Sequence, residues 1–339
     1  MTTPAFRALK DSLSDRRLTL LTSSAGSAIA PLIPEVDHTI VYDSPWLKAT
    51  APRESPKPEY EMIELLRQHQ FDGVIIFTVY SQNPLPSAFL CYMAGIPLRL
   101  AHCHENPYQL LTDWIKDPEP DLGIRHEVQR QLDLVAEIGA TTENQKLSIR
   151  IAQKDRDRVS DLITSLNLPK QWVVIHTGAT APSRRYSIEQ FAIVADQLIL
   201  EHDCAVIFTG TTLELDIVAQ IRSRMQAEAH SLVCQLNLSE LTALIELAPV
   251  LISNNTAPAH IAAAVSTPVV DLYALTNPQH TPWQVPHRLL FQDVPCKYCY
   301  KSICPEGHHH CLAQVAPETV VKAACELLKE AAQTLEISA

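Results

Sequence analysis

The second half of the chain alternates short apolar runs with longer segments of helical spacing, and this alternation limits the fold more than any other feature. The apolar runs are residues 172–176, 205–209, 232–235, 250–253 and 268–272. The segments of helical spacing are residues 187–200, 213–224, 239–247 and 257–264. Short buried strands that alternate with helices form a parallel sheet with helices on both faces. The pattern therefore predicts a doubly wound α/β domain.

The first half repeats this pattern less regularly. The predicted elements are strands at 18–22, 39–42, 73–78 and 96–100 and helices at 60–69 and 126–138. A polar stretch at 141–147 then predicts a connection, and a length of 339 residues suits two domains. We therefore expect Rossmann-like domains at 1–145 and 146–339, the second ending in an amphipathic helix at 317–335. In such folds a ligand binds in the cleft, at the carboxyl ends of the strands.

The composition argues against several classes of protein. Glycine is scarce, at 8 of 339 residues, and neither G-x-x-x-x-G-K-[ST] nor G-x-G-x-x-G occurs, which disfavours P-loop NTPases and dinucleotide-fingerprint dehydrogenases. The net charge of −11 disfavours a nucleic-acid binder. The sequence has no run of 18 apolar residues and no signal-peptide pattern at its start. Nine cysteines without an export signal indicate reduced thiols, and we expect a cytoplasmic protein.

The loop after the run at 172–176 has the composition of a phosphate-binding loop. It carries the hydroxyls of Thr177 and Thr180, the glycine Gly178, and the guanidinium groups of Arg184 and Arg185 just before a predicted helix. Backbone N–H groups at a helix N-terminus and bidentate arginines both favour a bound diphosphate. The alternative is a solvated loop whose arginines make surface ion pairs.

Two further strand ends carry candidate ligand groups. Gly210 follows the run at 205–209 and would let a ligand approach the backbone, and Glu214 in the next turn could accept hydrogen bonds from a ribose. Asn255, Thr256 and His260 follow the run at 250–253 and would face the same site. The structural alternatives are that Glu214 complements a helix dipole and that Asn255 and Thr256 simply cap a helix.

These three loops, in this order, resemble those of glycosyltransferase family 9, the lipopolysaccharide heptosyltransferases. The family pattern S-N-D-T-G-P-x-H-x-A-A-A…T-P-V-V-x-L-[YF]-G is similar to NNTAPAHIAAAVSTPVVDLYA here. The segments HTGATAPSRRYSIEQFAIVADQL and FTGTTLELD resemble the family's G-A-S…K-R-W-P-x-E-x-F-A and x-T-G-G…E-x-E stretches. With similar segments upstream, the resemblance covers nearly the whole chain.

The resemblance implies a GT-B fold and an inverting, metal-independent transfer of heptose from ADP-heptose to a lipid-linked core saccharide. It further implies that Arg184 and Arg185 stabilise the departing diphosphate and that Thr180 and Thr256 bind the phosphates. Glu214 would bind the ribose. Asn255 and His260 would contact the sugar and the diphosphate. An amphiphilic acceptor also implies transient contact with the inner face of the inner membrane.

Two departures from the family pattern bear on activity. The family's D-T-G stands as Asn255-Thr256-Ala257 here, so an amide replaces a carboxylate that could act as a base. Family members also begin with a strand and a loop, [RK]-x-D-x-x-G-D, whose Asp is the expected general base, whereas this sequence starts at the following helix. We therefore expect the base and the first strand to lie upstream of Met1, and we assign no catalytic residue. The alternatives are a non-catalytic sugar-nucleotide-binding homologue and a family member that uses another nucleotide sugar.

Four cysteines cluster near the C-terminus in the spacing C-x2-C-x4-C-x6-C. They are Cys296, Cys299, Cys304 and Cys311. Four thiolates this close in sequence can close around zinc or an iron–sulfur cluster. The spacing lacks the second C-x2-C of a zinc ribbon, so reduced thiols and disulfides stay open as alternatives to a structural metal site.

Overall fold

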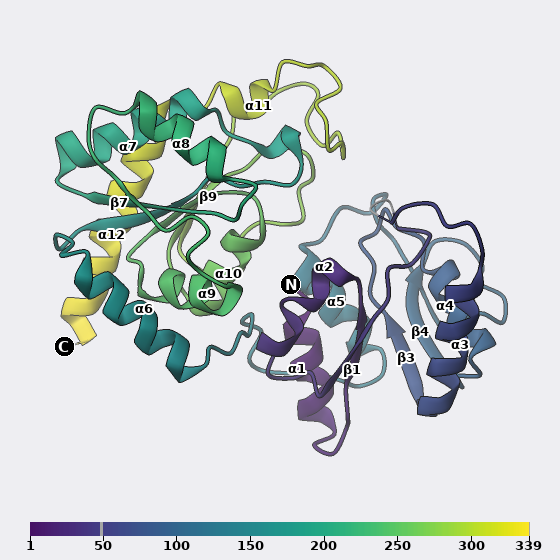
Figure 1. Ribbon diagram of the computed structural model, residues 1–339. Helices are drawn as coiled ribbons and strands as arrows, with labels where there is room; N and C mark the ends of the chain where they lie inside the picture. The colour runs from purple at the N-terminus through teal and green to yellow at the C-terminus, as the bar shows by residue number, and fades with distance from the viewer. Residues whose placement is uncertain (48–49, 339) are drawn as a thin grey trace. The chain divides into compact units, whose positions relative to one another are not determined.

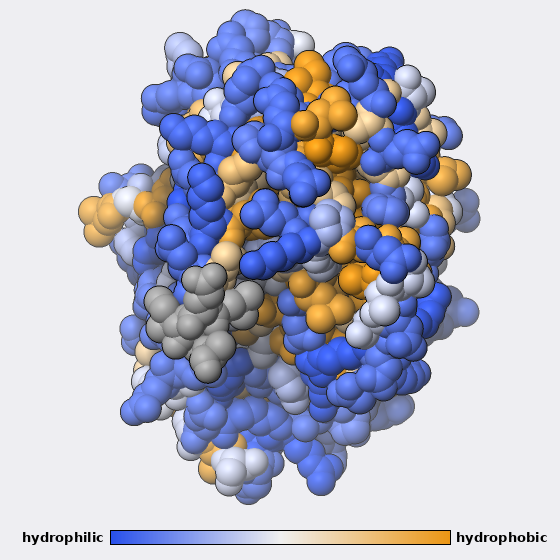
Figure 2. All heavy atoms as spheres, turned by 90° about the vertical axis from the view of Figure 1, so that its left-hand side faces the viewer, coloured by the Kyte–Doolittle hydropathy of each residue, from blue (hydrophilic) through white to orange (hydrophobic). Residues whose placement is uncertain are grey.

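The computed structural model describes residues 1–47 and 50–338, with side chains described as far as residue 333. The chain forms two compact units, Met1–Gln145 and Lys146–Ala339 (Figure 1). Within the described chain no helix is both long and apolar enough to cross a membrane. The face drawn in Figure 2 is largely hydrophilic, with hydrophobic side chains gathered in local patches.

The C-terminal unit contains one six-stranded sheet in which every pairing is parallel, in the order β11-β10-β9-β6-β7-β8. Its strands are β6 (Trp172–His176), β7 (Ala205–Thr209), β8 (His230–Ser231), β9 (Leu251–Asn254), β10 (Val269–Leu272) and β11 (His287–Leu290). Its α-helices are α6 (Gln153–Ser165), α7 (Ile188–His202), α8 (Leu215–Arg224), α9 (Leu238–Leu247), α10 (Ala257–Val265), α11 (His310–Ala313) and α12 (Pro317–Ser338). A short 3-10 turn, η2 (Pro182–Arg184), precedes α7.

Helices cover both faces of this sheet, as the alternation predicts. Figure 1 shows α7 and α8 on one side and α9 and α10 on the other. Every residue of β6, β9 and β10 is buried, because a strand between two helical layers exposes neither row of side chains to water. On the α7 side, Ile175, Phe208 and Leu272 pack with Phe191 of α7 and Leu327 of α12 in one continuous core. This burial of apolar surface is the main stabilising contribution in the unit.

Most of the elements predicted for this unit are confirmed. The prediction of a strand at 232–235 is wrong, because β8 comprises only His230–Ser231 and residues 233–235 form a turn. β8 pairs with β7 alone, and Cys234 adopts a left-handed backbone with φ +62°, which ends the extended conformation. Helix α6 and strand β11 were not predicted.

The N-terminal unit has two separate parallel sheets, one of two strands and one of three. The strands are β1 (Thr19–Thr22), β2 (His38–Val41), β3 (Gly73–Ile76), β4 (Leu98–Cys103) and β5 (Asp113–Lys116), in the orders β1-β2 and β3-β4-β5. The helical segments are α1 (Thr3–Ser12), α2 (Ser24–Ser27), η1 (Ala30–Leu32), α3 (Lys57–His69), α4 (Leu85–Met93) and α5 (Glu127–Ala136). Helix α1 packs on α5. Among the described residues no strand joins the two sheets, and the expected additional first strand stays a prediction.

Candidate functional site

The three loops singled out in the sequence leave from adjacent strands of the C-terminal sheet. His176 at the end of β6 lies opposite Ser253 of β9 on one side and Thr209 of β7 on the other. The chain runs outward from β6 to β8 and then returns to place β9 on the opposite side of β6. Such a reversal at the carboxyl ends of parallel strands is where ligands bind in open α/β sheets. The structure therefore brings the predicted loops together at a topological switch point.

The loop after β6 is fixed at both ends by one buried side chain. The Nδ2 of Asn254 donates to the carbonyl of Thr177 at 2.8 Å, and its Oδ1 accepts from the backbone N–H of Tyr186 at 3.0 Å. Between these points Thr180 is exposed and Arg184, in η2, is half-buried, whereas Ala179 and Ser183 are buried. Arg185 is exposed, and its Nε donates to the carbonyl of Ala179 at 2.8 Å. Two guanidinium groups are thus carried by a loop of defined shape.

Gly178 and Gly210 make room for the side chain of Glu214. A Cβ added at Gly178 would lie 2.9 Å from the Cδ and Oε1 of Glu214, and one at Gly210 would lie 2.6 Å from its Cβ. The Oε2 of Glu214 accepts from the backbone N–H of Thr211 at 2.8 Å and from its hydroxyl at 2.7 Å. Glu214 is 9% exposed. Its carboxylate therefore joins the loops after β6 and β7, and alanine at either glycine would displace it.

His176 lies beneath this arrangement and was not predicted as a site residue. Its Nδ1 is 3.1 Å from the hydroxyl of Thr209, and its Nε2 is 2.9 Å from the position of a Cβ at Gly178. Burial lowers the pKa of His176 to about 4, although the nearby carboxylate of Glu214 opposes the shift. The imidazole is therefore neutral at physiological pH. Its position as the last residue of a buried strand is the signal that could have identified it.

Helix α10 begins at the same edge of the sheet, with Thr256 as its N-cap residue. The hydroxyl of Thr256 donates to the carbonyl of Asn254 at 3.2 Å and lies 3.5 Å from the carbonyl of Gly178. The side chain of Thr256 accepts no hydrogen bond from the N–H groups of the first helical turn. The prediction that its side chain caps the helix is therefore wrong. His260, half-buried, lies one turn into this helix. At the N-terminus of α10 Pro258 has no N–H, and that of Ala259 donates to the carbonyl of Thr256. The N–H of Ala257 is therefore the first-turn donor available to an anion.

Asn255 lies beside a buried carboxyl group that was not predicted. Its Nδ2 donates to the Oδ2 of Asp271 at 3.4 Å and to the carbonyl of His280 at 3.1 Å. Asp271 has no exposed surface. Burial raises the pKa of Asp271 well above the usual range, and the guanidinium of Arg184 partly opposes this shift. Asp271 comes before the strand end in sequence, so a search restricted to loops could not find it.

The cysteine-rich segment packs against the arginine loop. The backbone N–H of Ser183 donates to the carbonyl of Ser302 at 3.1 Å, and its hydroxyl donates to that of Lys301 at 2.9 Å. Four cysteines and His308 help to line a cavity of about 20 Å³, with the Sγ of Cys296 at 3.9 Å from the Nε2 of His308. The four cysteines are Cys296, Cys299, Cys304 and Cys311.

The metal site considered for these cysteines has no support in the structure. Across the described residues, no three His, Cys, Asp or Glu side chains are arranged to hold a metal ion. All nine cysteines are free thiols, so the four form no disulfide either. A zinc or iron–sulfur cluster needs convergent ligands. The four cysteines line one small cavity, but no three of them are arranged to hold an ion. The cysteines here support the fold of a segment that braces the arginine loop.

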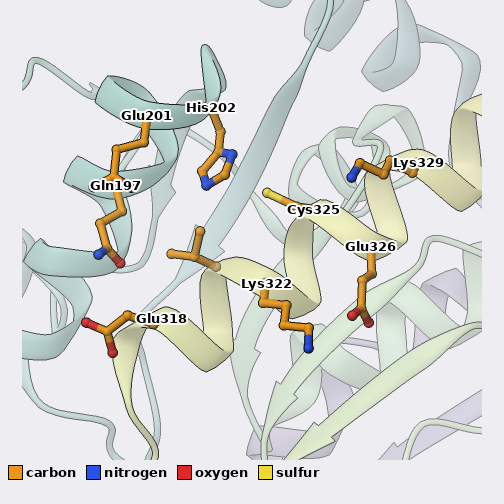
Figure 3. Close-up of a pocket in the computed structure, with 9 residues that line it drawn as sticks. Gln197, Glu201, His202, Glu318, Lys322, Cys325, Glu326 and Lys329 are labelled. Carbon is orange, nitrogen blue, oxygen red and sulfur yellow. The ribbon is translucent and has the colours of Figure 1, made fainter.

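A larger hollow, of about 380 Å³, lies between α7 and α12 (Figure 3). Figure 3 shows Gln197, Glu201 and His202 on one side and residues of α12, including Glu318 and Lys322, on the other. The α7 residues come just before β7 in the chain, so this hollow lies where the strands begin. Ligands of this fold bind at the opposite edge, and the hollow is not part of the candidate site.

The N-terminal unit carries a buried ionic cluster at the end of its three-stranded sheet, which was also not predicted. The guanidinium of Arg130 in α5 pairs with Asp117, and its Nε lies 2.9 Å from Glu119. The side chains of all three residues are 1% exposed. The Nε2 of His102 lies 3.3 Å from the carbonyl of Arg130. Arg125 also pairs with Asp117 and Glu119, at 3.7 and 3.1 Å. Two guanidinium groups thus balance the two carboxylates, and the cluster is an internal support for the strand ends.

Comparison with known proteins gives consistent matches. The sequence profile of glycosyltransferase family 9 (heptosyltransferase) matches residues 60–310. Lipopolysaccharide heptosyltransferase 2 of Escherichia coli strain K12 is 25% identical over 274 residues, which cover 76% of this chain and 75% of that protein. A solved family 9 glycosyltransferase from Veillonella parvula superposes with a TM-score of 0.79 at 23% identity, over 97% of this chain and 93% of the other. The E. coli ADP-heptose lipopolysaccharide heptosyltransferase II gives a TM-score of 0.73 at 20% identity, with coverages of 97% and 94%.

Proposed function

Because the chain belongs to glycosyltransferase family 9, we propose that it transfers a heptose from ADP-heptose to a sugar of the lipopolysaccharide core. The chain is a glycosyltransferase of the GT-B fold, with two Rossmann-like domains. The observation that carries the proposal is the convergence of the loops after β6, β7 and β9 at one switch point. The donor and the acceptor class follow those of the E. coli relatives named above.

The diphosphate of the donor would lie between the arginine loop and the N-terminus of α10. Transfer through an oxocarbenium-like centre leaves negative charge on the departing ADP. Arg184 and Arg185 supply positive charge, and the N-terminus of α10 supplies its dipole and the N–H of Ala257. Pro258 has no N–H, and the N–H of Ala259 donates to the carbonyl of Thr256. The hydroxyl of Thr180 is a further phosphate ligand. The hydroxyl of Thr256 would become one by rotating from the carbonyl of Asn254, to which it donates here, toward the phosphate. In this proposal protein groups alone stabilise the leaving group, without a metal ion.

Glu214 would bind the ribose of ADP through the carboxylate oxygen that Thr211 does not use. The Oε2 accepts two hydrogen bonds from Thr211, which fixes the plane of the carboxylate and leaves Oε1 on the Gly178 side. Asn255 and His260 would contact the transferred sugar and the diphosphate. The neutral His176 beneath them adds no positive charge to the site, so the arginines are its main cationic groups.

The acceptor hydroxyl would attack the anomeric carbon from the side opposite to ADP and so invert its configuration. Asn255 is an amide and cannot take up the proton of the acceptor, so the general base belongs to the acceptor side, and none of the donor-loop residues has this role. Because the acceptor is anchored in lipid, we place the reaction at the inner face of the inner membrane.

A second candidate function is that of a non-catalytic protein that binds a sugar nucleotide. The observation that favours it is the amide of Asn255 at the position where the family pattern has a carboxylate. This protein would bind ADP and ADP-sugars through the same loops but would not turn them over. A family member with another nucleotide sugar would instead turn over that donor.

The test combines binding with turnover. Isothermal titration with ADP and a transfer assay with ADP-heptose and Kdo–lipid A are run on the wild type, on Arg184→Ala and on the control Arg222→Ala. In the transfer assay each chain carries the family's opening strand and loop before Met1. Arg222 is exposed near the end of α8. Loss of a charge-assisted contact predicts about tenfold weaker ADP binding for Arg184→Ala only. Binding of ADP without transfer would favour the second candidate, and wild-type protein that binds no ADP would contradict both.

A further inference from the structure

The buried Asp271 lies on the side of the C-terminal sheet away from the main core. Its neighbours Val270 and Leu272 belong to the core packed under α7 and α12, and side chains along a strand alternate between faces. Asp271 therefore points to the other face, the one shared with Ser253, its register partner on β9. An aspartate with no exposed surface is costly unless its carboxyl group has a partner.

The partner that the structure provides is the amide of Asn255. The Nδ2 of Asn255 donates to Asp271 at 3.4 Å and to the backbone carbonyl of His280 at 3.1 Å. A backbone carbonyl can only accept, so the His280 contact requires nitrogen on that side of the amide. The amide oxygen of Asn255 must then lie on the opposite side of its planar group.

We propose that Asp271 is a positioning residue for the transferred sugar: it holds the amide of Asn255 so that its oxygen accepts a hydroxyl of the sugar. This inference rests on the proposed function and deepens it. The family pattern has a carboxylate at the position of Asn255 and an unspecified residue at that of Asp271. In this chain the carboxyl group of Asp271 would not contact the sugar itself. The side chain of Asn255 lies between them, and Asp271 acts through it.

The charges around Asp271 agree with an indirect role. Its Oδ1 has no hydrogen-bond partner among the described residues, and the nearest cationic influence is the half-buried Arg184. Tyr273, on the same strand, donates its hydroxyl to the carbonyl of Asn277 at 2.8 Å and makes no direct pair with Asp271. Among the described residues Asp271 makes one direct hydrogen bond, to Asn255, and no ion pair, so its replacement should act on the sugar end of the donor.

The test compares the affinities for ADP-heptose and for ADP, which lacks the sugar, in Asp271→Leu, Asp271→Asn, Asn255→Ala and the double variant Asn255→Ala/Asp271→Leu. Asp271→Leu removes the acceptor of the Asn255 amide, so its affinity for ADP-heptose should fall about tenfold. Its affinity for ADP should equal that of the wild type. Asp271→Asn keeps an acceptor oxygen and should stay within about twofold of the wild type. The double variant should bind ADP-heptose no more weakly than Asn255→Ala, because Asp271 acts through Asn255.

Three outcomes would overturn the inference. Equal loss of ADP and ADP-heptose in Asp271→Leu would show a merely structural role. Additive losses in the double variant would show that Asp271 acts independently of Asn255, and an Asp271→Asn variant as weak as Asp271→Leu would show that the charge itself matters. Thermal unfolding of the same four variants without ligand measures the coupling of the pair directly. This measurement shows whether Asp271 and Asn255 interact even if the wild type binds no ADP. Absence of ADP binding would contradict the proposed function but not the coupling of the two residues.

Discussion

The two units use parallel strands in different ways. In the C-terminal unit β6, β9 and β10 each pair on both sides and are buried along their whole length. In the N-terminal unit β1 and β3 each pair on one side only, and both are partly exposed. A strand that pairs on one side leaves a row of N–H and C=O groups to water. The C-terminal sheet is thus one continuous sheet that carries the loops at its edge. The two N-terminal sheets are smaller, and interactions other than strand pairing must contribute more to their stability.

The same contrast appears in the buried aspartates at the strand ends. Asp117 of the N-terminal unit is ionised in a cluster with Arg130. Burial alone would raise the pKa of Asp117, but its hydrogen bond to Arg130 and the positive charge there more than offset this effect, so that the pKa is lowered. Asp271 of the C-terminal unit has no ion pair within hydrogen-bond distance, and burial raises its pKa. In the N-terminal unit ion pairs stabilise the strand ends, whereas in the C-terminal unit apolar packing does so.

The largest effect is expected from neutralising the paired aspartate. Asp117→Asn removes one of the two buried carboxylates that pair with the guanidinium of Arg130 and should lower the free energy of unfolding by about 3–5 kcal/mol. The matched variant Asp271→Asn removes no ion pair and should cost less than about 1 kcal/mol. Denaturant unfolding of both variants measures the difference. Equal costs would show that the two units do not differ in how they hold a buried charge.

The next effect concerns the apolar core. Ile252 of β9 is fully buried in the large core, and Ile252→Ala should lower the free energy of unfolding by about 2–5 kcal/mol. Ile40 of β2 is only partly buried, beside a small cluster, and Ile40→Ala should cost about 1 kcal/mol because less surface returns to water. The measurement is the same denaturant titration. An Ile40→Ala variant as unstable as Ile252→Ala would contradict the view that the N-terminal unit depends less on apolar packing.

A third effect depends on pH. The pKa of His176 is lowered to about 4 in the folded protein, from 6.5 when unfolded. The unfolded chain therefore takes up the proton first, and the stability due to His176, complete above pH 6.5, is lost as the pH falls toward 4. The loss should reach about 3 kcal/mol relative to His176→Gln, which cannot titrate.

Asp271 also makes the free energy of unfolding depend on pH, but in the opposite direction to His176, and the comparison of the wild type with His176→Gln controls for it. Its raised pKa makes the folded protein bind the proton more tightly, so its contribution to stability is lost as the pH rises above the usual range for Asp. This slope is common to the wild type and His176→Gln and cancels in their difference. A difference that stays flat between pH 6.5 and 4 would mean that His176 is not buried as a neutral group.

The sequence predicts the C-terminal unit well because burial on both faces leaves continuous apolar runs. The runs at β6, β7 and β9 are all confirmed. Strand β5 escaped prediction since its residues, Asp113–Lys116, include charged side chains and Trp114 is 40% exposed. Helix α4 was not predicted because Phe89 and Tyr92 are apolar but exposed, so the apolar residues of this segment do not fall on one face of a helix.

The candidate site divides in the same way. Loop residues such as Arg184 and Thr256 could be named from the sequence, because parallel strand ends must lie at one edge. For His176 the one signal was its place at the end of a buried apolar run. Asp271 could not be named, since it sits inside a strand and gains its properties from neighbours distant in the sequence. The contact of Ser183 with the cysteine-rich segment is of the same kind. The possible metal site in that segment stays unsupported, because cysteine spacing along the chain does not specify where the sulfur atoms point.

The smallest effect is expected in the backbone hydrogen bonds and tests the difference between the sheets directly. Hydrogen exchange should be at least about tenfold faster for the amides of β1 and β3 than for those of β6 and β9, because strands that pair on one side open at a lower free-energy cost than strands in the interior of a sheet. Strand β8, which pairs only with β7, provides the control within the C-terminal unit. It should exchange as fast as β1 if edge position is the cause. Slow exchange at β1 and β3 beside fast exchange at β8 would mean that the edges of the N-terminal sheets are covered in solution, and the contrast between the two units would then lie in their buried charges alone.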